Sequence, residues 1–391
     1  MKYLGYGEAE LISAGGINTG REISLQPQLW QKVFVEFERQ KADLDIFLDL
    51  ALKEVSRIIL TGAGSSAFIG QSLKGSFKRW LHTYAVDVPT TDIVTNPGDF
   101  FGPDDAVLLV SFARSGNSPE SVAAVALADT LCKKCFHLII TCDGSGELAN
   151  YRTGSPKQVF VLPQGSNDLG LAMTGSYSGM LLAGLLLTRI KNSHSLQQKV
   201  SLLATYGENF LEDCSPMIRK AAELDFERAV FLGSGPLLGT ATESKLKLQE
   251  LTDGRIICKN DSYLGFRHGP KAVINERTLV VFLMSGDPYV QQFETDLVRT
   301  MERENRAMAT AGVFESPNQE FRFDFTWSPS RNGSSLEDDF LTVCNILPAQ
   351  ILGFYKSLHL NLKPDSPSAS GTISRVVEGV NIYPYMSEPS L

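Results

Sequence analysis

The sequence contains an internal repeat, which constrains the fold more than any other feature. The segment RIILTGAG at residues 57–64 matches RAVFLGSG at residues 228–235, 171 positions further along the chain. At nearly the same offset, VLLVSFARSG at 107–116 resembles LVVFLMSG at 279–286. A repeat of this length indicates two homologous units in tandem. We therefore divide the chain into an N-terminal arm and helix (1–55), a first unit (56–224), a second unit (225–363) and a C-terminal tail (364–391).

Within the first unit, short apolar runs typical of buried strands alternate with helical patterns. Continuous apolar strands joined by helices indicate a parallel sheet that is covered on both faces. The predicted fold class is α/β, with two tandem units that are each a parallel sheet flanked by helices in a flavodoxin-like three-layer sandwich. Strands are predicted at 57–61, 107–111, 137–141 and 158–162, and helices at 27–55, from 65 to about 84, at 118–131, at 171–190 and at 196–224. The first 25 or so residues are expected to form an aperiodic arm.

The composition excludes several classes of protein. A net charge of -8 and a pI near 5.3 argue against a protein that coats nucleic acid or an anionic membrane. No apolar run reaches the length that spans a bilayer. The six cysteines are few for the length and are expected to be reduced thiols in the cytoplasm. Cys132 and Cys135 form a C-x-x-C pair, but this is a weak metal signal without a second pair or a well-placed histidine, so no metal is expected.

A turn rich in hydroxyl groups follows the apolar run at 106–110, with the sequence SFARSGNSPES at 111–121. Ligands of open parallel sheets collect beyond the carboxyl ends of the strands, and a turn that opens into a helix presents unpaired N–H groups to an anion. Arg114 would add a cation, and Ser115 and Ser118 would add hydroxyl donors, so the turn is predicted to bind a phosphate.

Helix capping is the alternative interpretation of this turn. Asn117 or Ser118, followed by Pro119 at the first helical position, would make a good N-terminal cap without any ligand. Capping accounts for one serine but not for the whole set. The second unit has Asp287 and Pro288 after Gly286 and therefore lacks the serine-rich turn.

Two further polar segments follow predicted strands. GAGSS at 62–66 is a weak nucleotide fingerprint because the G-x-G-x-x-G spacing fails. Ser65 and Ser66 are better interpreted as capping hydroxyls that could also donate to sugar oxygens. Thr174, in the segment MTGS, could complete the same pocket.

In the second unit, Glu243, Lys247 and Glu250 are spaced to lie on one face of a helix. They form either a solvated charged face or part of a catalytic site. The second interpretation is favoured by His268 in the nearby segment GFRHGP, because a carboxylate and a histidine are what a 1,2-proton transfer with sugar-ring opening requires.

The segments GAGSS, ARSGNS, KLKLQEL and GFRHGP together resemble the sugar isomerase (SIS) family, including the isomerase half of glucosamine-6-phosphate synthase. Over nearly the whole chain, RIILTGAGSSAFIG, VPTTDIVTNPGDF, SFARSGNSPESVAAV, LGFRHGPK and PDSPSASGTISRVVEGV resemble its galactosamine-6-phosphate deaminase/isomerase members. The resemblance implies that the chain is two SIS units with the tail over the active site. It implies an amino-sugar phosphate substrate, no cofactor, and a homodimer with shared active sites.

The resemblance also implies a role for each motif residue. Glu250 would shuttle the proton, and His268 would open the sugar ring, in the synthase by reaching into the neighbouring subunit. The synthase's C-terminal catalytic lysine has no counterpart in the segment SASGTISR. Either Arg375 or Ser370 would stand near its place, and an arginine is a poor proton carrier. Substrate-binding roles are implied for Ser65, Ser66, Arg114, Ser115, Ser118, Thr174, Lys247 and Arg375.

The expected reaction converts D-galactosamine 6-phosphate and water to D-tagatose 6-phosphate and ammonia through an enolamine. Release of ammonia is expected rather than its fixation, because no glutaminase segment supplies ammonia. Two alternatives stay open: an aldose–ketose isomerase that does not deaminate, and a non-catalytic protein that senses a sugar phosphate. The galacto or gluco configuration of the substrate rests on the resemblance alone.

Overall fold

The computed structural model describes residues 2–316, 321–331, 333, 335–377 and 379–385. Its first unit is built on a sheet of five parallel strands in the order β4-β3-β5-β6-β7. This is the flavodoxin-like order, in which the chain turns back between the first and third strands. The strands are β3 (Arg57–Thr61), β4 (Tyr84–Asp87), β5 (Ala106–Ala113), β6 (Lys134–Thr141) and β7 (Lys157–Val161).

The second unit repeats this architecture. Its five parallel strands run in the order β12-β11-β10-β8-β9, which is the same connectivity. The predicted α/β fold with two tandem units is therefore confirmed. The strands are β8 (Arg228–Gly233), β9 (Ile257–Asp261), β10 (Thr278–Leu283), β11 (Ala309–Val313) and β12 (Phe325–Trp327).

The repeated glycines adopt the same backbone conformation in both units. Gly64 has φ 55° and ψ −127°, and Gly235 has φ 53° and ψ −125°. A side chain at Gly62 or at Gly233 would collide with the first turn of the following helix. These positions accept only glycine, which explains why the sequence repeat is clearest there.

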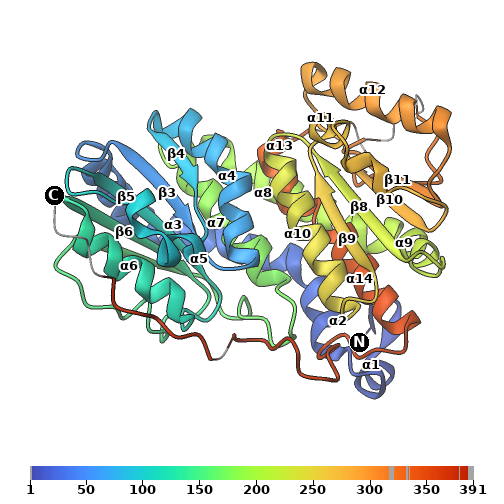
Figure 1. Cartoon of the computed structure of the whole chain (residues 1–391), viewed down its shortest axis with the longest axis horizontal. Coiled ribbons are helices and arrows are strands. Elements are labelled where there is room, and N and C mark those ends of the chain that lie inside the picture. Colours follow the sequence, from blue (N-terminus) through green and yellow to red (C-terminus); the bar gives the residue numbers. More distant parts are fainter. Residues whose placement is uncertain (1, 317–320, 332, 334, 378, 386–391) are drawn as a thin grey trace.

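Helices cover both faces of each sheet, and the main core lies between the two sheets (Figure 1). Alternate residues of β3 face opposite cores, with Ile58 and Leu60 in the central core and Ile59 in an outer core beneath α6. The helices of the N-terminal part and the first unit are α3 (Gln26–Leu52), α4 (Ser65–Leu81), α5 (Thr90–Thr95), α6 (Pro119–Leu131), α7 (Gly175–Thr188), α8 (Leu196–Asn209) and α9 (Ser215–Ala222). Those of the second unit are α10 (Pro236–Leu251), α11 (Tyr263–Phe266), α12 (Pro288–Glu304), α13 (Asp338–Cys344) and α14 (Leu347–His359).

The two units meet where α4 packs on α10, side by side at the centre of the molecule (Figure 1). Gly239 of α10 lies so close to Ser72 of α4 that an added Cβ would stand 2.2 Å from the serine Oγ and 2.6 Å from its backbone nitrogen. The close approach brings the C-terminal turn of α10 against the first unit. The proposed boundaries at 55/56 and 224/225 each fall between a helix and a strand, and the boundary at 363/364 follows α14.

Two local predictions were wrong. The N-terminal segment is not an aperiodic arm, because it forms β1 (Lys2–Tyr3), β2 (Tyr6–Gly7), α1 (Glu8–Ala14) and α2 (Ile17–Ser24). Asp365 accepts hydrogen bonds from the Asn18 and Thr19 backbone nitrogens at 3.1 and 2.7 Å, a distant contact that no local pattern reveals. The helix predicted to reach about residue 84 ends at Leu81, and the edge strand β4 follows it. None of the helices in the described ranges is long and apolar enough to cross a membrane.

Candidate active site

A cavity of about 560 Å³ opens at the carboxyl ends of β3 and β5. These adjacent strands connect to opposite sides of the sheet, which is the switch point where ligands of this fold class bind. The wall is made by the turns after β3 and β5, by the C-terminal turn of α10 and by the tail. Of the residues that the sequence singles out, the lining contains Ser65, Ser66, Arg114, Ser115, Ser118, Glu250 and Arg375.

The serine-rich turn leads from β5 into α6 at the floor of this cavity. Gly116 has φ +70°, which lets the turn fold tightly. Ser118 occupies the N-cap of α6, as the capping interpretation requires, but its side chain makes no capping hydrogen bond. The hydroxyl of Ser118 lines the cavity, so it is left to donate to a ligand.

Two arginines lie next to this turn. The buried Arg114 guanidinium donates hydrogen bonds to the carbonyls of Leu171, at 3.1 Å, and of Arg375. Arg375 itself donates to the Asn167 side chain at 2.7 Å and to the Asp168 carbonyl at 2.6 and 2.8 Å. The pKa of Arg114 is lowered, first by burial and then by the charge of Arg375. A bound anion would relieve this crowding of positive charge.

Glu250 enters the cavity from the second unit. Lys247, one turn earlier on α10, contacts Glu250 Oε2 at 2.6 Å and Glu243 Oε1 at 3.2 Å, and it donates to Ser65 Oγ at 3.1 Å. The side chains of Glu243 and Lys247 are 0% exposed, and that of Glu250 is 24% exposed. The solvated-face interpretation of these residues is therefore wrong.

The two carboxylates hold Lys247 in its cationic form. Burial alone would lower the pKa of Lys247, but the carboxylates of Glu243 and Glu250 outweigh it and the pKa is raised. Burial raises the pKa of Glu243 to about 7, against the opposing effect of Lys247. The result is a permanent cation beneath Glu250, which fixes the carboxylate at the cavity wall. A fixed carboxylate there can take a proton from a bound ligand and return it.

Three predicted site residues do not line this cavity. Lys247 is fully buried and contacts Glu250. Thr174 is fully buried, and its Oγ1 and backbone nitrogen donate to the Asp168 carboxylate at 3.1 and 2.8 Å. His268 lies just beyond α11 with an exposed side chain, away from the cavity of its own chain.

The resemblance places the C-terminal tail over the active site, but Arg375 is the only tail residue among the predicted site residues. Residues 371–377 contribute to the wall, and the tail runs from the second unit along the first (Figure 1). Leu171 and Met173 add apolar surface to the lining. No periodic pattern marks these segments, because tertiary contacts such as that of Arg375 with Asp168 hold them in place. Residues 378 and 386–391 of the predicted tail lie outside the described residues.

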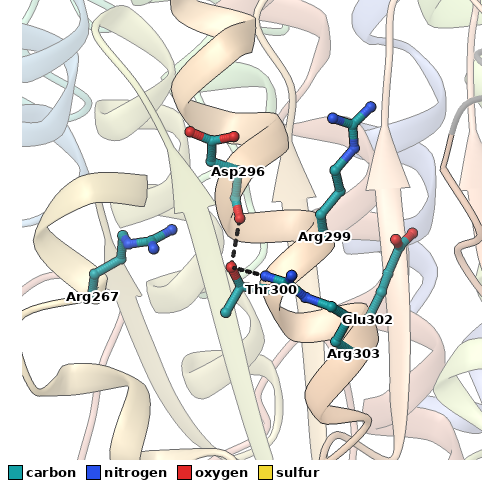
Figure 2. Close-up of a pocket in the computed structure, with 6 residues that line it drawn as sticks. All are labelled: Arg267, Asp296, Arg299, Thr300, Glu302 and Arg303. Carbon is teal, nitrogen blue, oxygen red and sulfur yellow. Dashed lines mark hydrogen bonds between the residues drawn. The ribbon is translucent and has the colours of Figure 1, made fainter.

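A second pocket, of about 480 Å³, lies on the outer surface of the second unit (Figure 2). Arg267, next to His268, faces Arg299 and Arg303 of α12, with the carboxylates of Asp296 and Glu302 among them. This second pocket is an open surface that carries charges of both signs. It has neither the serine-rich turn nor the buried ion pair that the first cavity has. The first cavity is therefore the candidate active site.

The fold and the site define a class of protein. The SIS domain family matches residues 51–189, and the repeated flavodoxin-like sheet and the cavity at its switch point fit a double-SIS architecture. Within that class the chain belongs to the AgaS family. It is 39% identical over 381 residues, which are 96% of this chain and 94% of the relative, to the D-galactosamine-6-phosphate deaminase AgaS of Shewanella sp. (strain ANA-3).

Solved structures agree at full length. A protein of Clostridium novyi NT, provisionally described as a tagatose-6-phosphate ketose/aldose isomerase, superposes with a TM-score of 0.95 at 36% identity, covering 98% of this chain and 100% of that one. The tagatose-6-phosphate ketose/aldose isomerase of Escherichia coli superposes with a TM-score of 0.86 at 33% identity, covering 97% and 100%.

Proposed function

We propose that this protein converts D-galactosamine 6-phosphate and water to D-tagatose 6-phosphate and ammonia. The observation that carries the proposal is a single cavity lined both by the serine-rich turn after β5 and by Glu250, whose carboxylate is held by Lys247. The substrate comes from the AgaS relatives, which are named as deaminases of this sugar and match nearly the full length.

The substrate binds through its phosphate to the turn after β5. Ser115, Ser118 and the backbone N–H groups of the α6 N-terminus donate hydrogen bonds, and Arg114 supplies positive charge. Ser65 and Ser66, at the start of α4, face the sugar. This arrangement directs the other end of the substrate toward Glu250 on α10.

In the open-chain sugar, Glu250 takes the proton from C2, and the C1 carbonyl oxygen gains a proton from solvent to become the hydroxyl of an enolamine. Return of the C2 proton to C1, with loss of one proton from the nitrogen to solvent, gives a C2 ketimine, which water hydrolyses to the ketone and ammonia. The amino group of the substrate itself supports this tautomerisation, so the protein supplies the base, the positioning and the phosphate seat.

Glu250→Gln tests the base directly. Glutamine keeps the size of the side chain but cannot accept a proton, so kcat should fall at least about 10³-fold, within the range of general-base catalysis, while substrate affinity changes little. Exchange of the C2 proton with solvent deuterium should also stop. If the variant still exchanges this proton at close to the wild-type rate, Glu250 is not the base.

An isomerase that does not deaminate is the second candidate, because the two solved structures are described as ketose/aldose isomerases. A coupled ammonia assay separates the two functions. Stoichiometric ammonia from galactosamine 6-phosphate supports the deaminase. If the protein interconverts tagatose 6-phosphate with its aldose and releases no ammonia from the amino sugar, the isomerase function replaces the proposed deaminase function. Glucosamine 6-phosphate, assayed in parallel, tests the configuration at C4.

We also propose a homodimer in which His268 serves the partner's cavity, since its side chain is exposed and does not line the cavity of its own chain. Mixing inactive Glu250→Gln with inactive His268→Asn should then restore part of the activity through hybrid dimers. No recovery after demonstrated subunit exchange would assign His268 to its own subunit or to a structural role.

All six cysteines are free thiols, which supports the proposed cytoplasmic location.

A further inference from the structure

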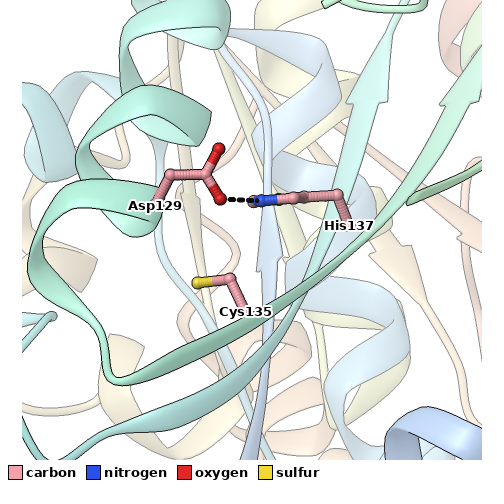
Figure 3. A group of neighbouring side chains, drawn as sticks. All are labelled: Asp129, Cys135 and His137. Atoms are coloured by element: carbon pink, nitrogen blue, oxygen red, sulfur yellow. Dashed lines mark hydrogen bonds and ion pairs between the residues drawn. The ribbon is translucent and has the colours of Figure 1, made fainter. Parts of the chain in front are cut away.

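A second group of reactive side chains lies in the first unit (Figure 3). Asp129 projects from the C-terminal turn of α6, and Cys135 and His137 project from β6. The two β6 residues are two positions apart and share a face of the sheet. One carboxylate oxygen, the thiol sulfur and one imidazole nitrogen all lie within 4.8 Å of one another.

Hydrogen bonding does not fully account for this group. His137 is completely buried, and one of its ring nitrogens lies 2.7 Å from Asp129 Oδ1. The other ring nitrogen, Nδ1, is buried without a partner, whereas buried polar atoms are normally paired. In the described parts of the chain, no lysine or arginine forms an ion pair with Asp129. The Asp129 carboxylate instead accepts hydrogen bonds from the hydroxyls of Thr153 and Ser155, each at 2.7 Å.

A further thiol lies next to this group, although its sulfur is not within 4.8 Å of all three of the other ligand atoms. Cys132 is the C-cap residue of α6, and its thiol lies beside that of Cys135. The C-x-x-C pair of Cys132 and Cys135 was a weak metal signal in the sequence because no well-placed histidine was evident. In the structure His137, two residues after Cys135, is such a histidine. Sulfur, nitrogen and oxygen donors with this spacing suit Zn²⁺, which binds four such ligands tetrahedrally.

We propose that Asp129, Cys132, Cys135 and His137 bind one Zn²⁺ ion. Zinc–ligand bonds of about 2.0–2.3 Å place tetrahedral ligands roughly 3.3–3.8 Å apart, so the Asp129–His137 contact opens by less than about 1 Å. Binding releases the two thiol protons to solvent. The ion replaces the hydrogen bond between Asp129 and His137 with bonds that tie α6 to β6.

The position of the site makes it structural. Cys135 and His137 belong to the amino-terminal half of β6, whereas the sugar cavity opens at the carboxyl ends of the strands. Zinc there is remote from Glu250 and supplies no step of the proposed reaction. Its effect should appear as stability of the α6–β6 contact and not as a requirement of the chemistry.

Zinc content tests the proposal independently of activity. Reduced, metal-free full-length protein is incubated with Zn²⁺, desalted and analysed by mass spectrometry for metal. About one zinc per chain is expected, with at least a tenfold loss in Cys135→Ser and in His137→Gln. Cys214→Ser is the matched control, because Cys214 is also a buried thiol facing a backbone carbonyl, and it should keep its zinc.

Two measurements keep the test decisive if a core variant fails to fold. Cys132 is partly exposed, so Cys132→Ser should fold and still show weakened zinc retention. Wild-type protein loaded with Co²⁺ should show thiolate-to-cobalt charge-transfer absorption. The proposal is overturned if reduced wild-type protein retains less than a tenth of an equivalent of zinc, or if Cys214→Ser loses as much as Cys135→Ser. The proposal is also overturned if Cys132 and Cys135 are found as a disulfide and the protein takes up no zinc after that disulfide is reduced.

Discussion

Removing the buried cation beneath Glu250 should make stability depend on pH in a way that the wild-type protein does not show. In Lys247→Met, the fully buried Glu243 loses the ammonium 3.2 Å away, while Glu250 remains near it. The pKa of Glu243, already raised to about 7 by burial with Lys247 in place, should rise further. The variant should therefore keep Glu243 protonated well above pH 7.

The magnitude follows from proton linkage. A carboxyl whose pKa is raised in the folded protein holds a proton that the unfolded chain has released, so stability falls as the pH rises until the folded pKa is reached. In the wild type, this fall ends near pH 7, where Glu243 ionises. In Lys247→Met it continues, at about 1.4 kcal/mol per pH unit. The difference between the two proteins should grow by about 2.7 kcal/mol from pH 7 to pH 9.

Urea unfolding at pH 6, 7, 8 and 9 measures this slope. The double variant Glu243→Gln with Lys247→Met is the control, because it has no carboxyl group at position 243 to titrate and should lack the added slope. The kcat of Lys247→Met should also fall, because Glu250 loses its closest partner. A difference in stability that is independent of pH, or an equal slope in the double variant, would refute the buried-triad argument.

Three further predictions rest on other contacts. Gly239→Ala should destabilise the protein by about 1–3 kcal/mol, as overpacking does, because the added Cβ would collide with Ser72. Thermal unfolding measures this loss. The control Gly75→Ala, also in a helix, should show no such loss, because its Cβ would meet only the end of a flexible arginine. Ser115→Ala with Ser118→Ala should raise KM at least about 100-fold, since each hydrogen bond to a charged group is worth about 1.5–3 kcal/mol, with the melting temperature unchanged. Burial raises the pKa of Glu294 to about 7, so wild-type stability should fall from about pH 5 to 7, and Glu294→Gln should reduce that fall by up to about 3 kcal/mol.

The sequence predicts the sheets well because their signals are local. A strand that is buried on both faces must be apolar throughout, and a glycine turn that tolerates no Cβ must keep its glycine in both repeats. The strand β4 lacks such a signal. It has four residues at the edge of the sheet, and the exposed Tyr84 begins it, so its pattern is that of a loop.

The residues of the candidate site could be predicted where they lie in a turn that follows a strand. They could not be predicted where their accessibility depends on how distant elements pack together. Helical spacing places Glu243, Lys247 and Glu250 on one face, but only the packing of α10 on α4 shows that this face is covered. Thr174 was predicted from its polar neighbours at the start of a helix. In the structure those donors converge on Asp168, a pairing within the chain that consumes the groups a ligand would need.

Hydrogen bonds within the chain also explain why the two homologous units share one cavity. In the second unit, the turn after β10 corresponds to the serine-rich turn of the first. There Asp338 accepts hydrogen bonds from the Gly286 nitrogen, at 2.7 Å, and from the Ser285 hydroxyl, while Glu294 accepts from the Ser285 nitrogen at 2.9 Å. The chain's own carboxylates thus occupy the donors that correspond to the proposed phosphate-binding donors of the first unit. The second unit contributes Glu250, the proposed base, because the C-terminal turn of α10 reaches the cavity of the first unit, where the equivalent donors remain open.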